Sequence, residues 1–358
     1  MNDDNISEAF KEAAMAVYET LEPERQDRTR RIAHMATTYV GTARDKLLDH
    51  AFDAIVENSA AEAFGKASKQ RVLFVIGESG SGKTTAVEKH LAKRPQFKPR
   101  VRSDGTLVYP MIWMEAPKPL THKGLAKAGL KALGHEVTNK SLTETELFDL
   151  WKTQICKQGV LFLAIDEMQH VIRGTSAKEV QNVADIVKSL VQIPGWPLHL
   201  ILSGVPALGR FLEQEGSTER QLKERSIIVE FQPMTYPEDV KVMTKVVQRI
   251  VTVDAELDAD GLEEKEFIHR LLHAGSGAFG SMIQITRKAC ENAMRGNRDT
   301  VSIKDFEVAY ALASGCRAAQ NIFTAPNWNQ IMPDQSLAEM LKNVSIATDS
   351  TTSKKRKK

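Results

Sequence analysis

The stretch GESGSGKTT, residues 77–85, follows an apolar run and precedes a segment with helical periodicity. It matches the pattern G-x-x-x-x-G-K-[ST] in the strand-then-helix context that a phosphate-binding loop requires. Glycines allow backbone N–H groups to surround a phosphate, and the start of the following helix adds a positive dipole end. We therefore expect this loop to bind ATP through the residues Gly77, Glu78, Ser79, Gly80, Ser81, Gly82, Lys83, Thr84 and Thr85.

Two side chains of the loop have distinct expected roles. Lys83 would reach the β- and γ-phosphates, and the Thr84 hydroxyl would ligate Mg²⁺. A second motif, VLFLAIDE, ends an apolar strand with Asp166 and Glu167. We expect Asp166 to hold Mg²⁺ through water and Glu167 to orient and deprotonate the attacking water. The alternative for Glu167 is a solvated loop residue.

Two further positions are candidates for catalysis. Ser203 ends the buried run LHLILS, where its hydroxyl would touch the attacking water or the γ-phosphate, or would cap the following turn. Arg225 precedes another strand and is expected to reach the nucleotide of a neighbouring subunit as an arginine finger. Arg220 is the second candidate for that role, and a surface salt bridge is the alternative for both.

Alternation of apolar runs with helical segments predicts an α/β fold with a five-stranded parallel sheet. The expected strands are Val72–Ile76, Leu107–Met114, Val160–Ile165, Leu198–Leu202 and Ile227–Phe231. We predict a helical N-terminal extension (1–65), a nucleotide-binding α/β domain (66–235), a small α-helical lid domain (236–318) and a C-terminal tail (319–358) that is basic and partly disordered.

Composition restricts the partners. Hydrophobic residues make up 42% and charged residues 26%, as in ordinary globular proteins. The net charge is +2, but the final KKRKK carries +5 and leaves −3 for the rest, so DNA contact would need a local patch or many subunits. Three scattered cysteines, no apolar leader and no membrane-length apolar run indicate a cytoplasmic protein.

The order of motifs resembles the AAA+ ATPase superfamily: phosphate loop, extra strand, Asp-Glu, polar strand end, arginine before the fifth strand, and helical lid. More narrowly, two stretches look like the TniB/TnsC family of transposition ATPases, and the resemblance covers about residues 25–315. Those stretches are EAPKPLTHKGLAKAGLKALG (115–134) and IDEMQHVIRGTSAKEVQNVADIVKSLVQIPGWPLHLILSGVPAL (165–208).

The resemblance implies a bacterial, DNA-associated ATPase, slow and regulatory, that uses ATP and Mg²⁺. It implies that subunits form a ring or helical filament around double-stranded DNA and contact the DNA backbone. It also implies a DDE transposase and a target-selection protein of TniQ type as partners, and disassembly of the oligomer when ATP is hydrolysed. The alternatives are a replication-initiator or helicase-loader ATPase and a signalling NTPase switch without a DNA role.

The resemblance leaves the lid and the DNA contacts open. Gly280 stands where related lids carry a sensor arginine, and Arg287 lies two turns further on. The best candidates for phosphate contact follow the second strand, where lysines recur every four residues on one predicted helix face. They are Thr121, Lys123, Lys127 and Lys131, with a solvated helix face as the alternative. The loop 173–178 and the KKRKK tail are secondary candidates.

Aromatic and histidine residues outside these motifs have simpler expected roles. Trp113, Trp151 and Trp196 lie in apolar patterns and are expected in the core, whereas Trp328 is expected to dock on another subunit or a partner. His269 and His273 have the spacing of a metal pair, but the glutamate of H-E-x-x-H is absent and no third ligand is evident, so a metal site is not expected.

Overall fold

A computed structural model of the chain describes residues 3–65, 68–118, 121–138, 141–168, 185–204 and 223–333, with side chains from residue 8 onward. Its contacts divide the chain into two compact units. One is an α/β unit, Gly41–Pro233, and the other a helical unit that combines Met1–Val40 with Met234–Lys358.

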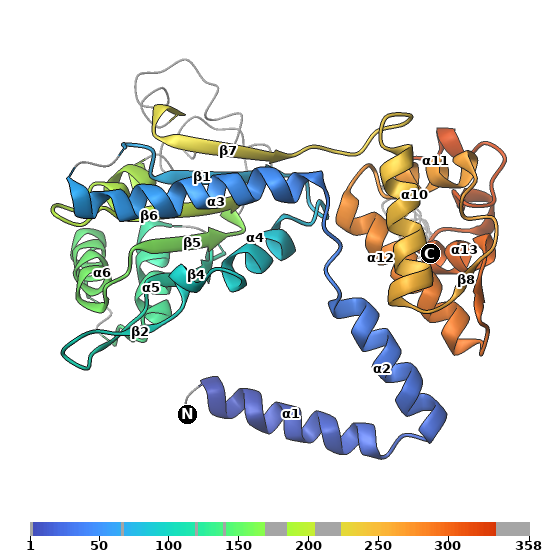
Figure 1. The fold of residues 1–358 in the computed structure, drawn as a ribbon, viewed down its shortest axis with the longest axis horizontal. Helices are drawn as coiled ribbons and strands as arrows, with labels where there is room; N and C mark the ends of the chain where they lie inside the picture. Colours follow the sequence, from blue (N-terminus) through green and yellow to red (C-terminus); the bar gives the residue numbers. More distant parts are fainter. Residues whose placement is uncertain are drawn as a thin grey trace, which may run out of the picture. The chain divides into compact units, whose positions relative to one another are not determined.

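The α/β unit contains the expected sheet (Figure 1). Within the described residues it has five parallel strands in the order β4-β5-β6-β1-β7. They are β1 Val72–Gly77, β4 Met111–Glu115, β5 Phe162–Asp166, β6 His199–Gly204 and β7 Ser226–Phe231. All residues of β1, β5 and β6 are buried, as their continuous apolar character predicts.

The expected strand Leu107–Met114 is split in the structure. Its first part, β3 (Leu107–Val108), pairs antiparallel with β2 (Arg100–Val101), and only β4 joins the main sheet. Pro110 separates the two parts, and its ring removes the N–H that a continuous strand would use. Trp113 lies on β4, an edge strand, and is 39% exposed, so the expectation that it is a core residue was wrong.

Helices cover both faces of the sheet. One face packs with α3 (Ala43–Ala61), which runs along β1 and β7, and with α4 (Lys83–Ala92) (Figure 1). On the other face, α5 (His122–Ala132) and α6 (Glu144–Gln158) share one buried cluster with the strands. The fully buried Trp151 of α6 belongs to that cluster, as predicted.

The helical unit has its own core. It contains α1 Asp3–Glu19, α2 Pro23–Thr37, α10 Val240–Gln248, the π-helical η4 Arg249–Asp254, α11 Lys265–Ala274, α12 Phe279–Arg295 and α13 Ile303–Ser314. Two short strands, β8 Asp258–Ala259 and β9 Thr300–Val301, pair in parallel. Short 3-10 turns complete the chain: η1 Glu62–Phe64 and η2 Pro95–Phe97 in the α/β unit, and η5 Ala318–Gln320 and η6 Trp328–Gln330 in the helical unit.

Contacts divide the N-terminal helices differently from the predicted boundaries. Met35 of α2 is buried in the core of the helical unit, whereas Leu48 and Phe52 of α3 are buried in the α/β unit. Beyond the predicted lid boundary at residue 318, Ile322 and Phe323 are buried in the helical core because both side chains are apolar. None of the helices that the structure describes is both long and apolar enough to span a bilayer.

Candidate nucleotide site

The loop Gly77–Thr85 begins where β1 ends, beside the end of β7, because Gly77 pairs with Phe231. A Cβ added to Gly77 would lie 2.8 Å from Cβ of Phe231 and 2.7 Å from Oγ of Ser81, closer than packed atoms allow. Gly80 and Gly82 have φ angles of 75° and 88°, which other residues rarely adopt. Glycine at these three positions therefore lets the backbone curl into the start of α4.

Lys83 is the first residue of α4 and is almost fully buried. Its Nζ donates to the Glu78 carbonyl at 3.2 Å. Burial lowers the pKa of Lys83, while the negative charges of Asp166 and Glu167 oppose that shift. Within the described residues, the buried Ser81 hydroxyl has no hydrogen-bond partner. A phosphate in the loop would supply acceptors for both groups.

The other positions of the loop are more open. Glu78, Ser79 and Gly80 are exposed at its tip, and Thr85 is exposed on α4. Thr84 is half-buried one residue after Lys83. The Lys83 ammonium and the Ser81 hydroxyl can donate to a triphosphate, and the Thr84 hydroxyl oxygen can ligate Mg²⁺. These groups of one loop therefore fit MgATP.

Asp166 ends β5, one strand away from β1, and is 4% exposed. Its Oδ1 accepts the Ser203 hydroxyl from the end of β6 and, at 2.7 Å, the backbone N–H of Glu167. Parallel strands bring their carboxyl ends to one edge, which is where ligands bind in open α/β sheets. Ser203 is buried and bonded to Asp166, so its contact in the structure is the carboxylate itself.

Glu167 has φ = 58°, in the left-handed region. For a residue with a side chain this conformation costs about 1–2 kcal/mol. The bond from its N–H to Asp166 and the burial of the next residue, Met168, hold the turn in place. The chain thus changes direction immediately after β5, at the residue predicted to be the general base.

Arg225 lies at the opposite edge of the sheet. Its carbonyl accepts from the N–H groups of Arg71 and Val72, at 3.0 and 3.2 Å, just before β1 and β7 begin. Gly77 is five residues beyond Val72, which corresponds to about 17 Å along a strand. The side chain of Arg225 therefore starts far from its own phosphate loop. Arg220 lies outside the described residues.

Residues 66–212 match a protein-family model described as an AAA domain. The chain carries an AAA-type P-loop ATPase domain. By structure, it is similar to Cdc6p from Pyrobaculum aerophilum, with a TM-score of 0.54, 11% identity, and coverage of 82% of this chain and 74% of that one. It is also similar to the ORC2 protein of Aeropyrum pernix in ADPNP–ADP complexes, with a TM-score of 0.52, 13% identity, and coverage of 79% and 72%. A sequence search of curated proteins found no match.

Of the predicted DNA-contact residues, Thr121 is the N-cap of α5 and the three lysines lie on that helix. Thr121 caps the helix by accepting from the Gly124 N–H at 2.9 Å, and Lys123 Nζ donates to the Leu142 carbonyl at 2.6 Å. Lys127 is half-buried and Lys131 is exposed. The structure thus assigns a local partner to two of the four candidates. The loop 173–178 and the KKRKK tail lie outside the described residues.

In the helical unit, Gly280 is the second residue of α12, and Arg287 lies on the same helix. The Arg287 guanidinium donates to the Thr38 carbonyl just after α2, and its burial lowers its pKa. Its role in the structure is therefore to attach the end of α2 to α12. This interaction was not evident from the sequence, because Thr38 and Arg287 are far apart in the chain.

Trp328 packs within its own chain. Its ring lies edge-on to His269 at 4.7 Å and to His273 at 5.5 Å, and Arg270 stacks over it. Trp328 therefore has contacts within its own chain, and its docking on another subunit or a partner protein stays a prediction. His269 also stacks on Tyr236, with 3.8 Å between ring centroids.

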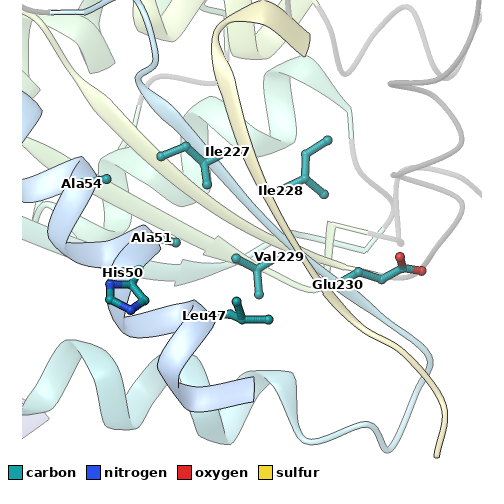
Figure 2. A pocket seen from close by; sticks show the side chains of 8 residues that line it. All are labelled: Leu47, His50, Ala51, Ala54, Ile227, Ile228, Val229 and Glu230. Atoms are coloured by element: carbon teal, nitrogen blue, oxygen red, sulfur yellow. The ribbon is translucent and has the colours of Figure 1, made fainter. Parts of the chain in front are cut away.

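A groove of about 330 Å³ lies between α3 and β7 (Figure 2). Its walls are Leu47, His50, Ala51 and Ala54 of α3 and residues 227–230 of β7. The groove contains neither the phosphate loop nor Asp166 and Glu167. The nucleotide site is therefore identified by its motif and hydrogen bonds, and this apolar groove is a separate feature of the surface.

Proposed function

We propose that the protein is an ATP-hydrolysing regulator of DNA transposition that assembles on target DNA. The main observation behind the proposal is the placement of two groups of residues. Lys83, Asp166 and Glu167 lie at the carboxyl edge of one sheet, and Arg225 lies at the amino edge. In this arrangement Arg225 would reach a nucleotide only in a second copy of the chain.

We assign ATP hydrolysis to the phosphate loop and to the two acidic residues after β5. Bound MgATP would supply the electrophilic γ-phosphoryl group and the metal charge. Lys83 would neutralise the β- and γ-phosphates, and Thr84 and Asp166 would hold the metal. Ser203 fixes Asp166 through its hydroxyl. Glu167, in its left-handed turn, would orient the attacking water and accept its proton.

Arg225 would act on the nucleotide of the next copy. A guanidinium stabilises negative charge on the transferring phosphoryl group, and such arginines contribute about 10³-fold or more to hydrolysis. Nucleotide binding and subunit contact would therefore be coupled: ATP favours assembly, and its hydrolysis favours release. This coupling suits a protein whose role is to mark a site temporarily.

The DNA role and its partners rest on the resemblance of residues 115–134 and 165–208 to the TniB/TnsC family. Double-stranded DNA would be held through its backbone, with Thr121, Lys123, Lys127 and Lys131 as candidates. Of these, Lys131 is the most accessible. A DDE transposase and a TniQ-type protein are the proposed protein partners.

Negative-stain microscopy with duplex DNA and a non-hydrolysable ATP analogue tests the proposal. The expected result is rings or filaments on DNA that require the analogue and disappear after incubation with ATP. A chain that stays monomeric with every nucleotide and duplex would contradict the assembly.

A second candidate function is replication initiation. The fold similarity to Cdc6p and to the ORC2 protein favours including it, although identities of 11% and 13% establish only the fold. Both candidates use the same ATP site. A transposition assay with a DDE transposase and a TniQ-type protein separates them, because only the proposed function predicts that insertion depends on this protein.

A further inference from the structure

In the sequence, a small β-hairpin made of β2 and β3 lies between α4 and β4 of the α/β unit. In it, β2 pairs with β3 so that Arg100 is opposite Val108 and Val101 is opposite Leu107. The Arg102 N–H donates to the Thr106 carbonyl at 2.9 Å and closes the turn, where Gly105 has φ = 82°. The hairpin therefore has a defined turn and two distinct faces.

The side chains of Lys98, Arg100 and Arg102 are all exposed. Arg100 and Arg102 alternate along extended backbone, so they point to the same side about 6.7 Å apart, and Lys98 precedes them at a bend, across Pro99. Within the described part of the chain, these three side chains have no hydrogen bond or ion pair. The nearest carboxylate in sequence, Asp104, accepts the Thr106 N–H at 2.9 Å, and this bond together with the positive charge of Arg102 lowers the pKa of Asp104.

Neighbouring cations differ from these three. Lys93 and Arg94, a few residues earlier, form ion pairs with Asp49 on α3. Arg102 has no ion pair of this kind within the described residues. Its Nη2 would lie 2.9 Å from a Cβ added to Gly159, the C-cap of α6, so the guanidinium lies at the C-terminus of that helix. The carboxyl end of a helix favours a cation there.

The positive charge of Lys98, Arg100 and Arg102 contrasts with the net charge of the rest of the chain. Without the terminal KKRKK the net charge is −3, so the body as a whole repels nucleic acid. Lys98, Arg100 and Arg102 are three exposed cations within five residues, so they offer a local positive charge that attracts phosphates, while the body as a whole does not.

We propose that this edge of the hairpin, Lys98, Arg100 and Arg102, binds the phosphate backbone of duplex DNA, in addition to the residues of α5. The inference rests on the proposed function, because it names a contact surface for the same DNA. Val108, directly opposite Arg100, shares the face of that arginine and is buried, whereas the opposite face carries the exposed apolar side chains of Val101, Leu107 and Tyr109, which are 66%, 50% and 42% exposed. Charge favours DNA over a protein as the ligand of the cationic edge.

The test uses the full chain with a duplex and a non-hydrolysable ATP analogue. The triple variant Lys98→Gln, Arg100→Gln, Arg102→Gln is compared with a matched variant in the helical unit, Lys241→Gln, Lys265→Gln, Lys304→Gln, whose three lysines are also exposed. Affinity is measured across a salt series. Each lost phosphate contact lowers the slope of log K against log salt by about 0.9, so the hairpin variant is expected to lose about 2.7.

The outcomes distinguish the two proposals. A reduced slope for the hairpin variant, with unchanged affinity for the ATP analogue and an unchanged slope for the matched variant, supports the hairpin contact. Equal slopes for wild type and hairpin variant overturn the hairpin contact and leave the proposed function standing. If the wild type binds no duplex with the analogue, both fail. If Val101→Ser with Leu107→Ser removes binding while the triple variant keeps it, the apolar face is the contact and the inference is wrong.

Discussion

Arg225 and Gly77 lie at opposite ends of one pair of parallel strands. The carbonyl of Arg225 accepts from the Val72 N–H where β1 begins, and Gly77 pairs with Phe231 where β1 and β7 end. The length of the strands therefore separates the predicted arginine finger from its own phosphate loop. This geometry makes the role of Arg225 in another copy's site directly testable.

Arg225→Ala is expected to lower ATP hydrolysis about 10³-fold while leaving nucleotide affinity within roughly threefold, because the arginine stabilises charge that develops only in the transition state. Mixing Arg225→Ala with Lys83→Ala tests the contact between copies. Some sites in the mixture combine an intact loop with an intact Arg225 from the neighbour. Steady-state hydrolysis of the mixture should exceed that of either variant alone; no recovery at any ratio would place Arg225 outside the site.

Lys83→Ala is expected to abolish ATP-dependent DNA binding. The substitution removes the buried ammonium group whose Nζ is held at the Glu78 carbonyl, and with it the charge that neutralises the β- and γ-phosphates. Fluorescence titration with a labelled ATP analogue and a duplex-binding assay measure the two effects. Normal duplex binding by this variant would show that nucleotide and DNA are not coupled.

Glu167→Gln is expected to retain bound nucleotide and to stabilise oligomers on DNA. The amide keeps the size of the side chain and the left-handed backbone at φ = 58° but cannot take the proton from water. Dissociation of complexes after dilution, followed by light scattering, is the measurement. Complexes that dissolve as fast as those of the wild type would exclude Glu167 as the general base.

The sequence was sufficient to predict the parallel sheet and the phosphate loop, because both leave a local signal: continuous apolar runs and closely spaced glycines. It was also sufficient to place Arg225 at the edge before the fifth strand. The partner of Ser203 could not be predicted, since Asp166 is far away in the chain and the register of β5 and β6 brings them together.

The sequence also could not show that α2 belongs to the helical unit and α3 to the α/β unit. Both α2 and α3 have helical periodicity, and nothing local shows that Met35 is buried in the helical unit whereas Phe52 is buried in the α/β unit, where it stacks on His90 of α4. Pro110 was a visible signal: a proline inside a predicted strand marks an edge or an interruption, and here it separates β3 from β4.

Gly129→Ala is expected to destabilise the α/β unit. A Cβ at Gly129 of α5 would lie 2.1 Å from Cε2 of Trp151 on α6, and that ring is fully buried. Overpacking costs about 1–3 kcal/mol, which exceeds the roughly 1 kcal/mol that alanine gains over glycine in a helix. Urea unfolding measures the loss. In a Trp151→Phe background the smaller ring should reduce the cost of Gly129→Ala, and an unchanged cost would contradict the predicted contact.

Acid is expected to destabilise the α/β unit through His199, at the start of β6. The side chain is fully buried, with Nε2 3.2 Å from Nδ2 of Asn58, and burial lowers the pKa of His199 from 6.5 to about 4. The positive charge of Arg71 acts in the same direction, and Glu62 opposes it.

Between pH 6.5 and 4 the unfolded chain binds a proton on this histidine and the folded chain does not, so the free energy of unfolding falls as the pH is lowered. The expected contribution is about 2 kcal/mol between pH 7 and pH 5. Urea unfolding of the wild type and of His199→Gln across this range isolates the effect, because the carboxylates titrate in both. The variant should be less stable at pH 7 but lose less stability on acidification. Parallel curves for the two proteins would show that His199 does not titrate as its burial predicts.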